Sequence, residues 1–200
     1  MLSDRRLDVI ETSSALFLDK GFAGTSMSMI AKRCGLTKAS LYHHFSGKEE
    51  LFVACVTHGY RAALDGLEGI VADRDEPPLT KLRAALSLLY ETTIVSPVGR
   101  MSPLIAEVSR TFPFVARSFH GDYIAPQQDM LWTIVEEGVA AGDFKKVDRK
   151  LLFHLIFGPM VTLSLSREMF ASFEDLDDHF PITPLKEGHI EVIVQMLVAE

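Results

Sequence analysis

Apolar residues recur at helical spacing along almost the whole 200-residue chain. In residues 3–20 the apolar side chains fall three or four positions apart, as at Leu7, Ile10 and Phe17, which predicts an amphipathic helix. The same spacing predicts helices over about 26–34, 37–43, 46–71, 79–95, 103–110, 114–140, 149–170 and 185–198. No segment shows a convincing strand pattern. The pattern therefore predicts an all-α fold.

Two of the predicted helices are short and joined by a tight turn. Thr25 or Ser26 can cap the first, because a hydroxyl accepts a hydrogen bond from a free N–H of the first helical turn. Gly35 follows its end, where a positive φ costs little, and Thr37 can cap the second helix. The apolar residues that the two helices would share as a small core are Ile30, Ala31, Leu36, Leu41 and Phe45. These features are typical of a helix–turn–helix unit.

The other face of the second short helix is polar. It carries Lys38, Ala39, Tyr42 and His43. Residues 25–48 contain four basic residues and no acidic one, and such a face fits the DNA major groove. There lysine can donate to guanine O6 or N7 and alanine can touch a thymine methyl, while Ser40 has no single hydrogen-bonding role. An ordinary helical hairpin with a solvated basic face would show the same pattern, so the unit alone leaves both interpretations open.

The residues that flank the unit decide between these interpretations. In order, the matching motifs are Gly21-Phe22, Gly24-Thr25-Ser26, Ile30-Ala31, Gly35-Leu36-Thr37, Leu41-Tyr42-His43-His44-Phe45 and Lys48-Glu49-Glu50-Leu51-Phe52. Over about the first fifty-five residues this series closely resembles the DNA-binding domain of the tetracycline-repressor (TetR) family. The resemblance implies a three-helix helix–turn–helix DNA-binding domain over residues 1–50. It also implies a helical bundle for ligand binding and dimerisation over residues 51–200.

The resemblance also suggests which side chains meet DNA. Thr25, Tyr42, His43 and Lys48 match family positions that hold phosphates, a task that suits hydroxyls, an imidazole and an ammonium at helix ends. The full predicted DNA-contacting set is Thr25, Thr37, Lys38, Ala39, Ser40, Tyr42, His43 and Lys48. The expected protein is a homodimeric transcriptional repressor. It would bind a palindromic operator in double-stranded DNA and be released by a small, mostly apolar or aromatic effector.

The formal net charge of −7 by itself argues against a nucleic-acid-binding protein. The distribution of the charge changes this conclusion. Residues 1–60 hold seven basic and six acidic residues, whereas residues 61–200 hold 13 basic and 21 acidic ones. The acidic excess therefore lies outside the predicted DNA-binding domain, where it would keep the remainder of the chain from binding DNA.

Nothing in the sequence points to secretion or to a membrane. The start of the chain is charged where a signal peptide would need an apolar stretch. The longest uncharged apolar stretch, residues 151–166, is shorter than the roughly twenty residues of a membrane span. We expect a cytoplasmic protein in which Cys34 and Cys55 are reduced thiols, since they have no metal or redox spacing. The alternative is a redox-responsive DNA-binding regulator that uses these two cysteines.

No motif for enzymatic chemistry is present in the sequence. His43 and His44 are adjacent, so they cannot easily face one metal ion from a helix, and the other histidines stand in separate segments. There is no phosphate loop, nucleotide fingerprint or nucleophile elbow. We therefore expect neither an enzyme nor a resident metal or cofactor.

The C-terminal part of the chain offers an effector pocket and a dimer surface. Aromatic-lined cavities with few polar groups suit apolar or aromatic molecules. The candidate lining residues are Tyr90, Met101, Arg110, Phe119, His120, Tyr123 and Trp132. The last two long helices are too apolar to be exposed on all sides, and their candidate partner-facing residues are Leu152, Leu155, Ile156, Leu163, Ile190, Val194 and Leu197. A second alternative remains, a helical small-molecule-binding protein that does not bind DNA.

Overall fold

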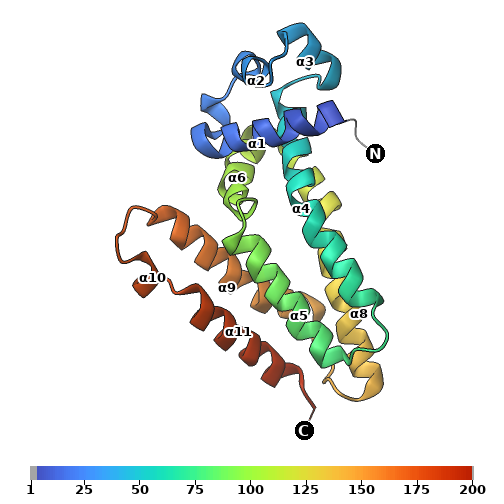
Figure 1. The fold of residues 1–200 in the computed structure, drawn as a ribbon. Coiled ribbons are helices and arrows are strands. Elements are labelled where there is room, and N and C mark those ends of the chain that lie inside the picture. The colour runs from blue at the N-terminus through green and yellow to red at the C-terminus, as the bar shows by residue number, and fades with distance from the viewer. Residues whose placement is uncertain (1–3, 200) are drawn as a thin grey trace. The chain divides into compact units, whose positions relative to one another are not determined.

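The computed structural model describes residues 4–199, and its regular elements are helices (Figure 1). The α-helices are α1 (Asp4–Gly24), α2 (Met27–Arg33), α3 (Lys38–His44), α4 (Lys48–Ala72), α5 (Pro78–Tyr90), α6 (Ser102–Thr111), α7 (Pro113–Phe119), α8 (Ala125–Ala141), α9 (Arg149–Met169), α10 (Leu176–His179) and α11 (Ile182–Leu197). Two π-helical turns, η1 (Glu91–Val95) and η3 (His120–Ile124), and one 3-10 turn, η2 (Gly99–Met101), complete the set. Within the described residues the only strand-like pairing is an isolated bridge between Phe144 and Val198. The all-α prediction is confirmed.

The chain divides into two compact units. The N-terminal unit comprises residues up to 61 together with residues 101–123, and the C-terminal unit comprises residues 62–100 and 124 onward. Helix α4 begins in the first unit and ends in the second. The boundary predicted at residue 50 falls in the first turn of this helix. The division into a domain of residues 1–50 and a domain of residues 51–200 stays a prediction.

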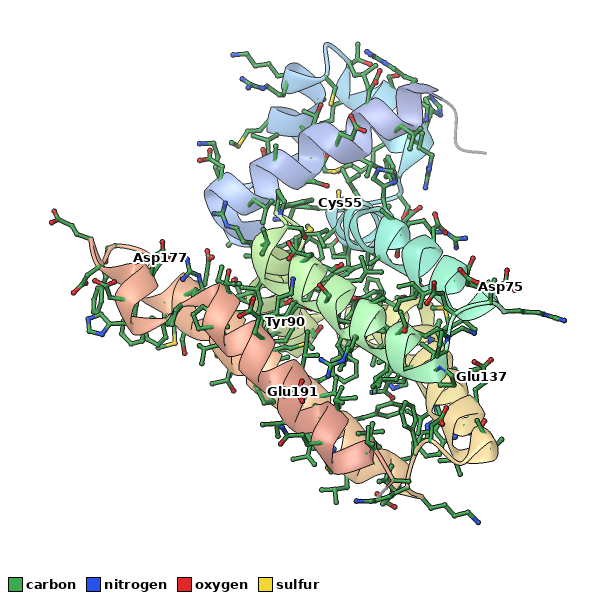
Figure 2. The ribbon with its side chains drawn as sticks, turned by 60° about the horizontal axis from the view of Figure 1, so that its bottom comes forward. Cys55, Asp75, Tyr90, Glu137, Asp177 and Glu191 are labelled. Carbon is green, nitrogen blue, oxygen red and sulfur yellow. The ribbon has the colours of Figure 1, made fainter. Side chains whose placement is uncertain are left out.

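An aromatic core joins α1 and α4 in the N-terminal unit. The rings of Phe17 and Phe52 meet edge to face with centroids 5.2 Å apart, and Phe22 packs against both. Cys55, one turn further along α4, is also buried (Figure 2). Gly21 has a φ of 71°, a conformation that costs glycine little, and it changes the chain direction just before Phe22. The predicted first helix therefore extends to Gly24 with a kink at Gly21.

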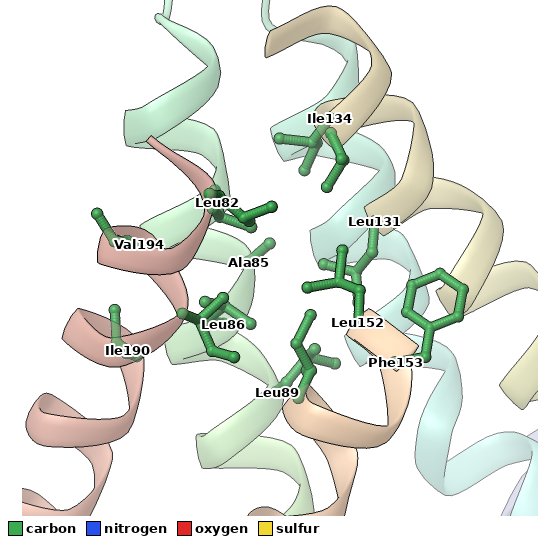
Figure 3. Close-up of a cluster of buried hydrophobic side chains, with 14 of the residues drawn as sticks. Leu82, Ala85, Leu86, Leu89, Leu131, Ile134, Leu152, Phe153, Ile190 and Val194 are labelled. Carbon is green, nitrogen blue, oxygen red and sulfur yellow. The ribbon is translucent and has the colours of Figure 1, made fainter. Parts of the chain in front are cut away.

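The core of the C-terminal unit lies between α5, α8, α9 and α11 (Figure 3). Each helix contributes aliphatic side chains at helical spacing, among them Leu82, Leu86 and Leu89 of α5, Leu131 and Ile134 of α8, Leu152 and Ile156 of α9, and Ile190 and Val194 of α11. Burial of such side chains contributes about 1.5–3 kcal/mol each to folding. This unit accordingly holds together by apolar packing between helices that are far apart in sequence.

Several predicted helix ends need correction. The predicted helix 79–95 becomes π-helical after Tyr90, and the predicted helix 114–140 is divided into α7, η3 and α8. Before α4, Oε2 of Glu50 accepts a hydrogen bond from the Ser46 N–H at 2.8 Å. Before α9, Oδ1 of Asp148 accepts a hydrogen bond from the Leu151 N–H at 2.8 Å and so caps this helix.

Helix α9 is continuous through Pro159, although a proline inside a helix usually kinks or interrupts it. A proline cannot donate to the carbonyl four residues earlier, so the carbonyl oxygen of Leu155 lacks its usual helical partner. In this fold Nε2 of His189, on α11, lies 2.9 Å from that oxygen. A side chain of a neighbouring helix thus replaces the missing donor, and the helix is not interrupted.

None of the helices in residues 4–199 combines the length and apolar character that crossing a membrane requires.

Candidate nucleic-acid interface

The helix–turn–helix unit is built from two capped seven-residue helices, α2 and α3. Oγ of Ser26 accepts a hydrogen bond from the Met29 N–H at 3.2 Å, so Ser26 rather than Thr25 caps α2. Thr37 caps α3, as predicted, with its Oγ1 3.1 Å from the Ser40 backbone nitrogen. Gly35 between the helices has a φ of 64°, which is easy only for glycine. These local contacts fix the conformation of the turn between α2 and α3.

One face of α3 is buried and the other is open to solvent. Leu41 and Phe45 pack into the unit with Ile30 and Ala31 of α2, as the apolar pattern predicts. The side chains of Lys38, Ala39, Tyr42 and His43 are exposed, and Ser40 and His44 are partly exposed. The ammonium of Lys38 lies 5.9 Å from the centre of the Tyr42 ring, one turn further along. The predicted base-reading side chains therefore share an accessible surface that has no acidic residue.

Two arginines of α1 hold the C-terminal ends of α2 and α3. Arg5 donates to the carbonyl oxygen of Cys34, which follows α2, at 2.8 Å. Arg6 donates to the carbonyl oxygen of His44, the last residue of α3, and its guanidinium lies 4.0 Å from the centre of the Phe45 ring. A cation at a helix C-terminus meets carbonyl groups that have no helical partner. The sequence analysis missed these residues, although adjacent arginines ahead of the unit are a visible signal.

Lys48 has a structural role that the sequence does not reveal. Its ammonium donates to the carbonyl oxygens of Phe22 at 2.8 Å and Thr25 at 2.9 Å, and it lies 4.1 Å from the centre of the Phe22 ring. These bonds join the start of α4 to the turn between α1 and α2. The positive charge is thereby held at the edge of the helix–turn–helix unit.

Thr25 is the member of the predicted DNA-contacting set that is least accessible. Its side chain is buried, and its hydroxyl lies 2.8 Å from the carbonyl oxygen of Gly21 and 3.2 Å from that of Leu16. The hydroxyl is therefore used within the protein, where it fixes the turn after α1. A phosphate contact through this hydroxyl stays a prediction that the geometry does not favour.

A family model described as bacterial regulatory proteins, tetR family, matches residues 9–55, which span most of α1, all of α2 and α3 and the start of α4. Residues 9–55 are a DNA-binding domain of the TetR family. In the KstR2 repressor of Mycolicibacterium smegmatis, 158 residues are 28% identical, covering 77% of this chain and 75% of that protein. The uncharacterised regulator YerO of Bacillus subtilis is 30% identical over 91 residues, or 45% of this chain, and the match spans about a third (32%) of the length of YerO.

Solved structures with the TetR fold extend the similarity to nearly the whole chain. FadR of Bacillus subtilis in complex with stearoyl-CoA has a TM-score of 0.77 at 17% identity and covers 95% of this chain and 98% of its own. AibR in complex with isovaleryl coenzyme A and operator DNA has a TM-score of 0.69 at 22% identity and covers 94% and 97%. At these identities the likeness concerns the fold, which has the TetR arrangement of a helix–turn–helix domain followed by a helical domain.

The candidate effector residues are divided between the two compact units of the chain. Met101, Arg110, Phe119, His120 and Tyr123 belong to the N-terminal unit, whereas Tyr90 and Trp132 belong to the C-terminal unit. Phe119 and Tyr123 stack with ring centroids 5.5 Å apart, and Tyr60 of α4, which the sequence analysis missed, lies 4.1 Å from Tyr123. Met101 is buried, while Arg110 and His120 are exposed. The rings of Phe119 and Tyr123 are in contact, and the assignment of these candidates to an effector pocket stays a prediction.

Tyr90 and Trp132 have partners that indicate structural roles. The Tyr90 hydroxyl lies 2.8 Å from Nδ1 of His189, and burial raises the pKa of Tyr90 to about 12. The indole N–H of Trp132 donates to Glu136 at 2.7 Å, and the ring packs against Phe153. Both residues contribute to the C-terminal unit, and their assignment to an effector pocket stays a prediction.

The structure corrects the face that was assigned to the dimer surface. Of the candidate residues, Leu152, Ile156, Leu163, Ile190, Val194 and Leu197 are buried inside their own unit, and only Leu155 is exposed. Apolar side chains that do face solvent lie on the opposite sides of α9 and α11, namely Leu151, Leu155, Val161, Leu165 and Met169 of α9 and Leu185 and Val192 of α11. The six buried residues therefore pack inside their own unit rather than on a surface, and the assignment of α9 and α11 to a dimer interface stays a prediction.

The two cysteines are not bonded to each other and differ in their exposure. Cys55 is buried, its Sγ lies 3.4 Å from the carbonyl oxygen of Ile10, and burial raises the pKa of its thiol to about 12. Since the thiolate is the reactive form, Cys55 is chemically protected. Cys34 is partly exposed, and both thiols are free. Among the described residues, no group of three or more His, Cys, Asp or Glu side chains is placed to hold a metal ion.

Proposed function

We propose that this chain is a transcriptional repressor that binds a palindromic operator as a homodimer and is released by a small apolar effector. The observation that carries the proposal is the exposed, acid-free face of α3, held by caps on α2 and α3 and by two arginines of α1. A short helix presented in this way suits insertion into the DNA major groove. The TetR-family DNA-binding domain of residues 9–55 supports this reading.

The exposed side chains of α3 would have two roles, base reading and phosphate contact. Lys38 would donate to a guanine edge, Ala39 would touch a thymine methyl, and Ser40 would accept or donate according to the base. Thr37, Tyr42 and His43 would hold phosphates at the two ends of the helix. The Thr37 oxygen accepts a bond from Ser40, which leaves its hydroxyl proton available for a phosphate oxygen. Lys48 would add positive charge close to the backbone without reading sequence.

The apolar outer face of α9 and α11 supports a homodimer. Leu165 has 46% of its surface exposed and Val192 has 62%, values that are high for large aliphatic side chains on adjacent helices. A second copy would cover this face with the same two helices, giving a four-helix interface of about 2,000 Å² or more. Two-fold symmetry would then place the two α3 helices about 34–36 Å apart, one turn of DNA.

The effector would act through different affinities for DNA-competent and DNA-incompetent states. FadR and AibR were solved with stearoyl-CoA and isovaleryl coenzyme A, ligands that carry an apolar acyl group. These ligands support an apolar effector for this chain. The aromatic cluster of Tyr60, Phe119 and Tyr123 beside the π-helical turn η3 offers an apolar surface, and such turns are frequent at functional sites.

Capture of genomic DNA fragments by the purified protein, followed by sequencing, tests the proposal. We expect a common palindromic motif whose half-sites are about 10 base pairs apart, and a variant with Lys38→Ala and Tyr42→Ala that captures none of it. Fragments without any common motif, captured equally by that variant, would favour a helical ligand-binding protein that does not use DNA. Neighbouring genes in the captured fragments would suggest the effector to test.

A further inference from the structure

The charges at the two ends of α9 are opposite to those that stabilise a helix. Residues 145–150, around its N-terminus, hold four basic residues and one acidic residue. Residues 170–181, which follow its C-terminus, hold four acidic residues and no lysine or arginine. A helix dipole favours negative charge at the N-terminus and positive charge at the C-terminus. Groups of opposite charge from outside the helix would therefore stabilise both ends of α9.

Some of these charges have partners within the chain and others do not. Arg149 pairs with Asp129, and Arg167 pairs with Asp177 at 2.8 Å. Across the described part of the chain no ion pair includes Lys150, Glu174 or Asp178. Unpaired positive charge therefore remains at one end of α9 and unpaired negative charge at the other.

A groove lies between α8 and α9 at the basic end. Its volume is about 460 Å³, and its lining residues are Ile124, Gln127, Gln128, Lys150, Phe153, His154, Phe157, Gly158 and Val161. The floor is apolar and aromatic, while Lys150 and His154 form a basic rim. Such a groove would accept an aromatic side chain that is flanked by carboxylates.

A segment with that chemistry follows the other end of α9. We call residues 170–181 the α9–α11 hairpin; it contains α10 and connects the two helices (Figure 2 labels Asp177 within it). Phe170 and Phe180 stack with ring centroids 5.4 Å apart, and Arg167 donates to the Phe180 carbonyl oxygen, so the hairpin is folded. Phe173 nevertheless has 45% of its surface exposed, and Glu174 follows it.

The hairpin cannot fill the groove of its own chain. Helix α9 has 21 residues, which corresponds to about 31 Å of length; the groove lies along its N-terminal half, up to Val161, whereas the hairpin follows its C-terminus. A second copy resolves this separation. If two α9 helices run antiparallel beside a two-fold axis, the acidic hairpin of each points toward the basic end of the other.

The outward stripe of α9 fixes the register of such a pair. Its members at helical spacing are His154, Gly158, Val161, Leu165 and Met169, all of them exposed. With the axis beside Leu165, Met169 would meet the partner subunit's Val161, four residues on either side of the axis. The hairpin follows Met169 directly, so it would begin beside the partner subunit's Val161, which lines the groove. Gly158 on this stripe would let the two backbones approach closely.

We propose that the α9–α11 hairpin of one copy docks into the α8–α9 groove of the second copy, with Phe173 in the groove and Glu174 and Asp178 beside Lys150. The inference rests on the homodimer of the proposed function and adds two symmetry-related contacts to it. The contact joins the acidic end of one subunit to the basic end of the other and so sets the antiparallel register of the pair.

Cysteine cross-linking tests this contact directly. In a Cys34→Ser background, Ser172→Cys places a thiol beside Phe173 and Gln128→Cys places one on the α8 side of the groove. We expect the Gln128→Cys, Ser172→Cys double variant to form covalent dimers with a short bis-maleimide, at least tenfold more than either single variant. A matched control combines Ser172→Cys with Ala140→Cys, which is exposed on α8 about 18 Å further along, and it should not cross-link.

Sedimentation separates failure of this contact from failure of the dimer. If the double variant sediments as a dimer at micromolar concentration but gives no more cross-linking than the control, the hairpin contact is wrong and the homodimer stands. If wild-type protein sediments as a monomer, both are wrong. As a second readout, Lys150→Glu should weaken dimerisation about two- to fivefold, the usual range for an exposed ion pair, and Glu174→Lys in the same chain should restore it. Failure of the second substitution to restore dimerisation would contradict the charge pairing.

Discussion

Nε2 of His189 lies 2.9 Å from the carbonyl oxygen of Leu155, the oxygen that Pro159 leaves without a helical donor. The other ring nitrogen of His189, Nδ1, lies 2.8 Å from the Tyr90 hydroxyl. When Nε2 carries the proton, Nδ1 accepts from the tyrosine, so one neutral imidazole satisfies groups on α5 and α9 from its place on α11. This arrangement holds three helices of the C-terminal unit together beside the apolar outer face.

Replacement of His189 by leucine should destabilise the protein by about 1–3 kcal/mol, because the Leu155 oxygen and the Tyr90 hydroxyl both lose a partner. Urea unfolding at pH 7.5, at one fixed protein concentration, measures this loss. His120→Leu is the matched control, since His120 is exposed and should change stability by less than about 0.5 kcal/mol. Equal effects of the two substitutions would show that the His189 contacts do not stabilise the fold.

The same histidine should make stability depend on pH. Burial lowers the pKa of His189 below its ordinary value of 6.5, and the hydrogen bond to Leu155 opposes this shift in part. The folded state therefore favours the neutral ring, so the contribution of His189 is complete above about pH 6.5 and is lost as the pH falls through the folded pKa. Wild-type protein should lose more stability between pH 7.5 and 5.5 than a His189→Gln variant. A steeper loss of stability in the variant would show that the folded state favours the charged imidazole of His189, contrary to this account.

Lys48 and Lys38 should differ in their effects on DNA binding. Lys38→Ala should change the preferred base at one position of each half-site at a cost of about 1–3 kcal/mol, because a base contact is lost. Lys48→Met should weaken binding to all sequences alike and lower protein stability, because its ammonium bonds Phe22 and Thr25. Titrations of operator variants over a salt series, with thermal unfolding of each protein, separate the effects. Equal losses on every operator for both variants would contradict this division.

The two cysteines should react at very different rates. At pH 7.5 a thiol reagent should modify Cys34 in the folded protein but leave Cys55 unmodified until the protein unfolds, because burial raises the pKa of Cys55 to about 12. Mass spectrometry of partially labelled protein gives the two rates. Oxidant-sensitive DNA binding that persists in a Cys34→Ser variant would restore a redox role for Cys55.

Charged substitutions on the two sides of α9 should have different consequences. Leu165→Glu lies on the exposed outer face, so it should leave the monomer folded and weaken dimerisation by roughly 3 kcal/mol or more, the cost of burying an unpaired charge. Leu163→Glu lies in the core and should unfold the C-terminal unit. Circular dichroism and sedimentation of both variants make the comparison. If Leu163→Glu gives a folded monomer while Leu165→Glu remains a dimer, the dimer interface lies on the side of α9 that carries Leu163, which would contradict this account.

The helix–turn–helix unit was predictable because its signals are local. Caps at Ser26 and Thr37, the glycine turn at Gly35 and the apolar pair Leu41 and Phe45 all act within a few residues, and the structure contains each of them. The contacts of Arg5, Arg6 and Lys48 were not predictable in the same way. They join segments more than twenty residues apart, and no sequence spacing encodes such a distance.

Helix α9 shows where the periodicity of apolar residues loses information. The helix is apolar on two sides, so its pattern does not reveal which side faces the core of its own unit. Packing against α5 and α8 selects Leu152, Ile156 and Leu163 for the inside and leaves Leu165 outside. The aromatic candidates show the same limit of sequence periodicity. Tyr90 and Trp132 are as aromatic as Tyr123, and only tertiary contacts separate the three.

Sedimentation of a labelled operator duplex with increasing protein is the most direct test of a dimeric DNA-binding regulator. The duplex would carry the palindromic motif recovered from captured genomic fragments. We expect a complex of two chains on each duplex, formed cooperatively, and its loss at the same protein concentration with Leu165→Glu although α3 is unchanged. A complex of one chain on each duplex, equally tight for wild type and Leu165→Glu, would contradict the dimeric regulator.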